Sequence, residues 1–120
     1  MKRAILYTRV STDEQADKGY SLRDQLDKLQ NYCQNNNIEV AKVFKEDYSA
    51  KTFERPEFKK LLNYAKANKK DIDYLIFVKW DRFSRNTGES YQMIKAFDNL
   101  QVNLNAIDQP LDLKIPEQLL

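Results

Sequence analysis

The sequence contains no histidine and only one cysteine among its 120 residues. The absence of histidine excludes Ser-His-Asp and Cys-His catalysis, and it excludes metal sites ligated by imidazole. A single cysteine excludes an internal disulfide and a thiolate zinc site. Cys33 lies on the apolar side of a predicted helix, which favours a small core residue. Any catalysis by this chain must therefore use other side chains.

Long apolar runs are also missing. The longest covers residues 74–78 between two charged residues, which is too short to span a membrane. Residues 1–3 lead into a short strand-like stretch without the apolar core of a signal peptide. We therefore expect a cytoplasmic protein with no membrane partner. The net charge is only +2, so a nucleic-acid contact requires local clustering of lysine and arginine.

The composition predicts one folded domain, with 42% apolar and 32% charged residues. Apolar runs and helical spacing alternate along the chain. The predicted strands are 4–7, 40–44, 74–78 and 102–107, and the predicted helices begin at Leu22 after a Ser21 cap, at Pro56, and after a Thr87 cap. Such alternation predicts an α/β fold, with a mainly parallel central sheet of about four to five strands flanked by helices.

Polar side chains gather where the predicted strands end. In open α/β sheets, ligands bind at the carboxyl ends of the strands. We therefore expect one rim to collect residues that are distant in the sequence. These residues are Arg9, Lys79, Arg82 and Arg85, with Asp47 and Asp81 between them and Asp108 at the end of the last strand.

Ser11 has two interpretations on this rim. Ser11 with Glu14, and Thr12 with Gln15, match the spacing of a helix capping box. On spacing alone, a helix cap is favoured over a nucleophile. Arg9, however, lies on the same side as Ser11 if the strand continues to that residue. A hydroxyl beside arginines, with no histidine available, suits attack on a phosphate, because guanidinium groups neutralise the charge of phosphoryl oxygens.

The other segments that carry arginine can also be explained by a structural role instead of a functional one. Residues 81–85 are explained equally well as a solvated loop after a buried strand. Arg55 precedes Pro56 at a predicted helix start, where a positive charge is unfavourable and weakly indicates an anionic partner. Trp80 and Phe83 can stack on bases, but packing against the neighbouring helix is the better explanation.

At these motifs the chain resembles the serine site-specific recombinases, a family of resolvases, invertases and large serine integrases. Residues 7–15 resemble the family's nucleophile motif, and residues 21–25 resemble the segment that follows it. Residues 46–56 resemble its mobile active-site loop, and residues 79–85 resemble its arginine motif. The resemblance covers the whole chain in the family's order and implies a resolvase-like catalytic domain.

The resemblance also implies roles for individual residues. Ser11 would attack a DNA phosphodiester, giving a 5′-phosphoserine link and a free 3′-hydroxyl, before strand exchange and religation without ATP. Arg9, Arg82 and Arg85 would bind the scissile phosphate, and Asp81 would either orient them or supply a proton. The remaining implied positions are Tyr7 and Gln15 in the catalytic site, and Gln25, Asp47, Arg55 and Lys79 at DNA or phosphate. No metal or other cofactor is expected.

The partners implied are double-stranded DNA and further copies of the chain, as a dimer and as a tetramer in the synapse. Residues 116–120 look like the first turn of a new helix. We therefore expect residues 1–120 to be a single catalytic domain, truncated at the start of the dimerising helix, without the DNA-binding region and inactive alone. One departure is Ala50, where many members have glycine, because alanine enters positive φ less easily; this affects the loop shape and the role of Arg55.

Two other functions fit parts of the sequence. Asp47, Asp81 and Asp108 suggest a metal-dependent nuclease, in which carboxylates at strand ends hold Mg²⁺ against a substrate phosphate. A non-catalytic oligomerisation or regulatory domain would leave the arginines as surface charge.

Overall fold

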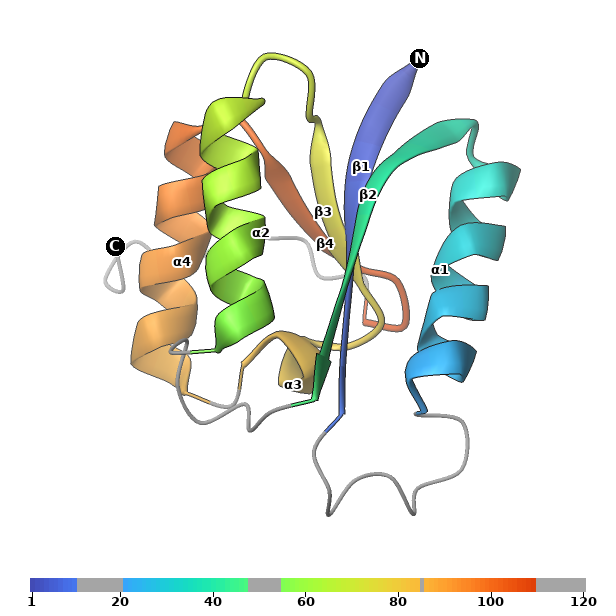
Figure 1. Ribbon diagram of the computed structural model, residues 1–120, viewed down its shortest axis with the longest axis horizontal. Coiled ribbons are helices and arrows are strands. Elements are labelled where there is room, and N and C mark those ends of the chain that lie inside the picture. Colours follow the sequence, from blue (N-terminus) through green and yellow to red (C-terminus); the bar gives the residue numbers. More distant parts are fainter. Residues whose placement is uncertain (11–20, 48–54, 85, 110–120) are drawn as a thin grey trace.

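The computed structural model describes residues 1–10, 21–47, 55–84 and 86–109. Strands and helices alternate along the chain, as Figure 1 shows. In order they are β1 (Lys2–Val10), α1 (Leu22–Asn35), β2 (Ile38–Asp47), α2 (Pro56–Ala67), β3 (Tyr74–Phe77), α3 (Trp80–Phe83), α4 (Thr87–Asn99) and β4 (Asn103–Ala106).

The four strands form one parallel sheet in the order β2-β1-β3-β4. β1 pairs with β2 along its whole length, from Lys2 opposite Ile38 to Val10 opposite Asp47. Its pairing with β3 covers only Ala4 to Leu6. The predicted α/β fold with a parallel sheet is confirmed.

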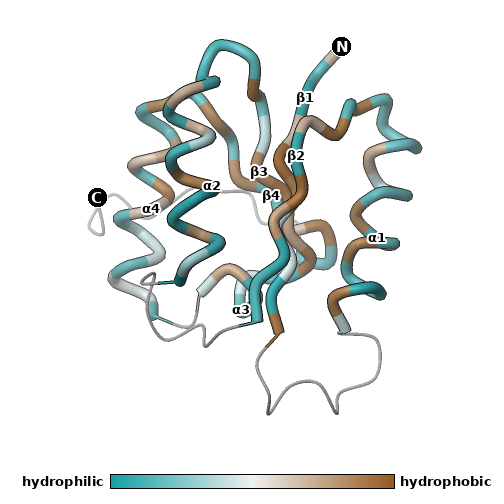
Figure 2. Tube along the Cα trace, viewed as in Figure 1, coloured by the Kyte–Doolittle hydropathy of each residue, from teal (hydrophilic) through white to brown (hydrophobic). Residues whose placement is uncertain are grey.

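Helices cover both faces of the sheet. α2 and α4 lie on one face and α1 lies on the other, and the most hydrophobic segments are the strands between them (Figures 1 and 2). Alternate residues of β1 enter opposite cores, because side chains alternate along a strand. Ile5 and Tyr7 join the core under α2 and α4, whereas Ala4 and Leu6 join the core under α1. Among the described residues, no helix combines the length and the apolar character that a membrane crossing requires.

The helix starts show how local sequence sets the fold. Ser21 caps α1 as predicted, because its hydroxyl accepts the backbone N–H of Asp24 at 3.1 Å. Pro56 occupies the first turn of α2, also as predicted. The predicted Thr87 cap is wrong. The side chain of Asn86 accepts the N–H of Glu89 at 3.0 Å, so α4 is capped one residue earlier.

The segment after β3 forms a helix of one turn, α3, where the sequence alone allowed a solvated loop. Its turn is closed by the N–H of Arg82 bonded to the carbonyl of Lys79 at 3.0 Å. The ring of Trp80 packs edge-on against Phe77 and Phe83, with centroids 5.0 and 5.9 Å away. These aromatic contacts pack α3 against the core. They agree with the interpretation that Trp80 and Phe83 serve packing.

Candidate active site

Arg9 joins the carboxyl end of β1 to α3. Its side chain is fully buried. Its Nε donates to the carbonyl of Arg82 at 3.0 Å, and its Nη2 donates to the carbonyl of Asp81 at 2.9 Å. A guanidinium can span two carbonyls in this way because its N–H groups lie in one plane. Two segments 73 residues apart in the sequence therefore meet at a single arginine.

Arg82 makes the reciprocal contact. Its Nη1 lies 3.5 Å from the carbonyl oxygen of Arg9. Its guanidinium also faces the carboxylate of Asp81, with Nε to Oδ1 at 3.2 Å and Nη2 to Oδ2 at 3.3 Å. Arg82 is 4% exposed, whereas the Asp81 side chain is about half exposed. The two-point contact fixes the plane of the Arg82 guanidinium.

Gln25 holds the same point of β1 from the opposite face. Its side chain extends from α1 and is fully buried. Its Oε1 accepts the N–H of Arg9 at 3.2 Å, and its Nε2 donates to the carbonyl of Arg9 at 2.9 Å. The amide thus bonds the strand as a neighbouring strand would. The predicted contact of Gln25 with DNA stays a prediction.

Arg55 lies at the start of α2 and is also fully buried. Its Nη1 donates to the Tyr7 hydroxyl at 3.0 Å, and its Nη2 donates to the carbonyl of Phe83 at 2.6 Å. The guanidinium carbon lies 5.6 Å from the ring centre of Tyr7 and 5.2 Å from that of Phe58. Burial lowers the pKa of the Arg55 guanidinium, but arginine keeps its charge in proteins. Arg55 therefore brings a positive charge beneath α3.

Tyr7 is a neutral bridge between opposite charges. Its hydroxyl accepts from Arg55 and lies 3.4 Å from Oε1 of Glu46, to which it donates. Burial raises the pKa of the Tyr7 phenol well above its usual range. The phenol therefore stays protonated at neutral pH, and full burial keeps it from attacking DNA as a nucleophile.

Glu46 is a site residue that the sequence prediction missed. It is 2% exposed, and its oxygens accept the backbone N–H groups of Phe58 at 2.8 Å and Glu57 at 3.1 Å. The prediction names its neighbour Asp47, which is exposed. Strand alternation is the signal that identifies Glu46, because it shares a face with the buried Phe44 two residues earlier.

Some predicted residues lie away from this cluster. Asp108 is exposed and pairs with Lys28 of α1 at 2.7 Å. Lys79 is half-buried at the cap of α3. Within the described part of the chain, no three acidic or cysteine side chains gather as metal ligands, so Asp47, Asp81 and Asp108 do not form one shared group of ligands.

Three predicted catalytic residues lie outside the described residues: Ser11, Gln15 and Arg85. The possible capping boxes at residues 11–15, the Ser49-Ala50 pair and the final segment 116–120 also lie outside them. Their assignments stay predictions.

The described cluster brings charges of both signs together. It combines the guanidinium groups of Arg9, Arg55 and Arg82 with two carboxylates, those of Glu46 and Asp81. The arginines come from different elements and converge on the single turn of α3. Backbone carbonyls accept from all three arginines, so the carboxyl end of the sheet is ordered around their guanidinium groups.

Comparison with known proteins identifies the family. Residues 4–120 match the family described as "Resolvase, N terminal domain". The Transposon Tn917 resolvase of Enterococcus faecalis is 29% identical over 106 residues, which cover 88% of this chain and 50% of that protein. The chain thus spans half the length of this relative.

Solved structures agree with this match. The N-terminal catalytic domain of TP901-1 integrase superposes with a TM-score of 0.83 at 26% identity, covering 96% of this chain and 84% of that one. A resolvase family site-specific recombinase from Streptococcus pneumoniae shares the fold, with a TM-score of 0.79 at 22% identity over 98% of this chain and 80% of that one. Because the family match extends over nearly the whole sequence, the chain belongs to the serine recombinases, as a resolvase N-terminal domain.

Proposed function

We propose that this chain is the catalytic domain of a site-specific DNA recombinase whose nucleophile is Ser11. The observation that carries the proposal is the mutual contact of Arg9 and Arg82 at the carboxyl end of β1. Ser11 follows Arg9 by two residues in the sequence, so their Cα atoms are at most about 7.6 Å apart. The proposal requires this hydroxyl to lie beside the arginine side chains.

The proposed reaction is a transfer of the phosphoryl group. Ser11 Oγ forms a bond to phosphorus and gives up its proton, while the bond from phosphorus to the 3′ oxygen breaks and that oxygen gains a proton. The products are a 5′-phosphoserine and a free 3′-hydroxyl. After strand exchange, a 3′-hydroxyl attacks the phosphoserine and releases Ser11. The covalent link retains the phosphodiester energy, so religation needs no ATP.

The arginines would supply charge neutralisation. Arg9, Arg82 and Arg85 would bind the oxygens of the scissile phosphate, whose charge must be stabilised in the transition state. Arg9 is fully buried and its Nε and Nη2 are bonded to carbonyls, so its direct contact with the phosphate is proposed from the family resemblance, and its described bonds support a role in holding the turn that carries Arg82. The reaction then requires no metal ion or other cofactor.

Asp81 has two possible roles in this reaction. Its two-point contact with the Arg82 guanidinium favours an orienting role over proton donation, since an orienting carboxylate must be ionised and bonded to the arginine.

The other proposed residues act around this centre. Tyr7 and Arg55 would hold α3, and Gln25 would hold the end of β1. The supporting roles of Gln15, Lys79 and Asp47 at the catalytic centre or on DNA come from the family resemblance. We further propose double-stranded DNA as the substrate, and a dimer that forms a tetramer at synapsis. The names of the relatives, a transposon resolvase and an integrase, support this class of substrate.

A covalent adduct tests the proposal directly. The complete gene product that contains this chain is incubated with its DNA site, and the adduct is mapped by mass spectrometry. We expect phosphoserine-linked DNA on Ser11, and its complete loss in Ser11→Ala with DNA binding retained. Ser90→Ala, in α4, serves as the control and should keep the adduct.

The same assay separates the alternatives. The serine mechanism predicts that cleavage persists in EDTA, whereas a metal-dependent nuclease would stop. Cleavage by Ser11→Ala would rule out the serine mechanism, and DNA transactions unchanged by Ser11→Ala without any adduct would indicate a non-catalytic domain.

A further inference from the structure

Glu46 is an acidic residue that β2 carries into the interior of the protein. A buried carboxylate is costly unless its oxygens are bonded. Both oxygens of Glu46 are bonded: Oε2 accepts the N–H of Glu57, and Oε1 accepts the N–H of Phe58 and faces the Tyr7 hydroxyl. Both oxygens of this carboxylate therefore have partners within the site, although the sequence analysis gives Glu46 no role of its own in the 46–56 motif.

The bonds of Glu46 replace a missing helix cap. A helix leaves its first N–H groups without partners, and a side chain at the N-cap position usually accepts one of them. Arg55 occupies the N-cap of α2, and its side chain makes no capping bond. Glu46 supplies the acceptor from the end of another element, and its negative charge is favourable at the helix N-terminus. The start of α2 is thereby fixed against the end of β2.

The same carboxylate also reaches Arg55 through Tyr7. The Tyr7 hydroxyl donates to Glu46 and accepts from Arg55, and Arg55 in turn donates to the carbonyl of Phe83. Phe83 is the last residue of α3, next to Arg82. Glu46 therefore holds Arg55 twice, by anchoring the helix on which it stands and by the hydroxyl that its guanidinium contacts.

These contacts also lie on either side of a segment that resembles the family's active-site loop. Glu46 and Asp47 precede residues 48–54, and Arg55 follows them. The bond from Glu46 to α2 therefore joins the two points at which this segment leaves and re-enters the described fold.

We propose that Glu46 is a positioning residue for phosphodiester cleavage, acting through Arg55 on the arginine-bearing turn α3. The proposal rests on the proposed function, because it presupposes that Arg55 and α3 serve the cleavage of DNA. Glu46 itself contacts neither substrate nor nucleophile in this account. Its removal should therefore slow the chemical step and leave DNA affinity unchanged.

The experiment compares Glu46→Gln, Arg55→Ala and the double variant in the complete gene product. The rate of Ser11-adduct formation at saturating DNA is measured beside the Kd for the same DNA. Glu46→Gln keeps the size of the side chain but places an amide nitrogen where an acceptor is needed. We expect the rate to fall by up to about 100-fold, the cost of a small misplacement in an active site, with Kd unchanged.

The double variant distinguishes positioning from general damage. If Glu46 acts through Arg55, adding Glu46→Gln to Arg55→Ala should lower the rate no further. Glu39→Gln is the matched control, because Glu39 lies on the same strand and bonds only the exposed end of Arg3 among the contacts described for it. A wild-type rate in Glu46→Gln, or rate losses that multiply in the double variant, would overturn the proposal.

Two further readouts keep these outcomes distinct. If Glu46→Gln does not fold, Glu46→Asp decides the matter, since it retains the carboxylate and shortens it by one methylene: a folded protein with slower adduct formation supports the proposal, and a wild-type rate refutes it. Failure of the proposed function is visible separately, as the absence of any Ser11 adduct in the wild-type protein.

Discussion

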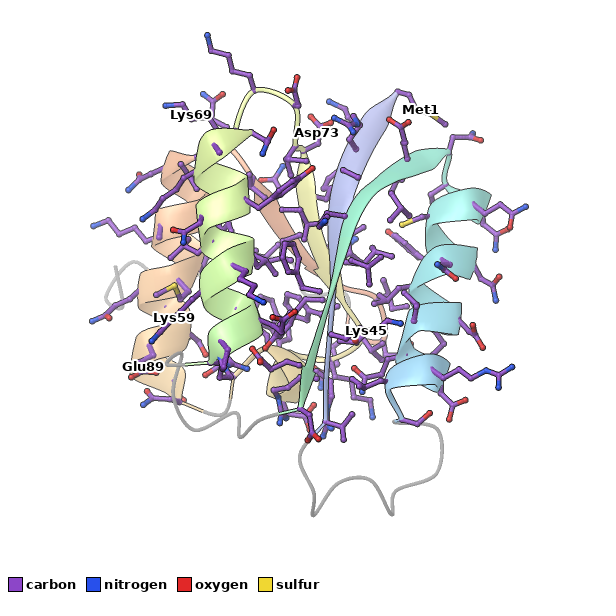
Figure 3. All side chains as sticks on the ribbon, in the orientation of Figure 1. Met1, Lys45, Lys59, Lys69, Asp73 and Glu89 are labelled. Atoms are coloured by element: carbon purple, nitrogen blue, oxygen red, sulfur yellow. The ribbon has the colours of Figure 1, made fainter. Side chains whose placement is uncertain are left out.

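The two ends of the sheet carry similar charged residues in opposite environments. At the amino end, Arg3 pairs with Glu39 at 2.8 Å and Lys2 lies 3.8 Å from Asp73, with all four side chains more than a third exposed. At the carboxyl end, Arg9 and Arg55 are fully buried and donate to backbone carbonyls. Figure 3 shows the two ends, with Met1 and Asp73 at one and Glu89, at the start of α4, at the other.

The two ends differ in how exposed their charged groups are and in what those groups bond. Exposed ion pairs contribute little, because water screens them and their side chains lose freedom. A buried guanidinium is retained only if its N–H groups are bonded, and carbonyls supply those bonds here. The buried guanidinium groups therefore order the carboxyl end of the sheet, whereas the exposed ion pairs contribute little at the amino end.

The largest expected effect contrasts the two ends directly. Arg9→Ala removes two charge-assisted bonds to the carbonyls of α3, so we expect the free energy of unfolding to fall by about 3 kcal/mol. Arg3→Ala removes an exposed pair and should cost less than about 1 kcal/mol. Urea unfolding of both variants measures the difference. Equal losses would show that burial does not separate the two ends.

A smaller effect is expected from the amide that holds β1. Gln25→Leu keeps the volume but removes both hydrogen bonds to the backbone of Arg9, and it should lower the free energy of unfolding by about 2 kcal/mol. Gln30→Leu, on the exposed side of the same helix, is the control and should stay within about 0.5 kcal/mol of the wild type. If the two variants unfold at the same urea concentration, the amide is not holding the strand.

The smallest effect concerns alkaline pH. Because burial raises the pKa of Tyr7, the folded state keeps its proton at a pH where the unfolded chain, with a pKa of about 10, loses it. The stability linked to this proton is complete below about pH 10 and declines above it by up to about 1.4 kcal/mol per pH unit. Tyr7→Phe should remove this part of the decline, as urea unfolding over the alkaline range will show. Parallel pH curves for both proteins would contradict it.

Much of the fold was predictable because its signals are local. The Ser21 cap, Pro56 and the helical spacing of apolar residues indicate α1 and α2, which the structure confirms. The α3 turn was not predictable, since four residues are too few to show helical periodicity. The cap of α4 was misplaced by one residue because Asn86 and Thr87 are adjacent residues that can both cap a helix.

The site was predictable only in part, for a related reason. The sequence groups Arg9, Arg82 and Asp81 because strand ends of a parallel sheet share one edge, and the structure brings these three residues together. Strand alternation puts Glu46 on the same face as Phe44, but the sequence alone does not tell whether that face or the face of Asp47 turns inward. That choice depends on the packing of β2 against α2, which buries Glu46 and leaves Asp47 in water.

Unequal neighbouring strands make room for chemistry within a regular sheet. β1 has nine residues and β3 has four, and the two pair over only three. β1 consequently extends beyond the end of β3. The position beside the final residues of β1 is occupied by α3, the helical turn that carries Arg82. A longer β3 would pair with these final residues by backbone hydrogen bonds, and the guanidinium groups of Arg9 and Arg82 would lose their present contacts. The early end of β3 is thus what allows Arg9 of β1 and Arg82 of α3 to contact each other in an otherwise regular parallel sheet.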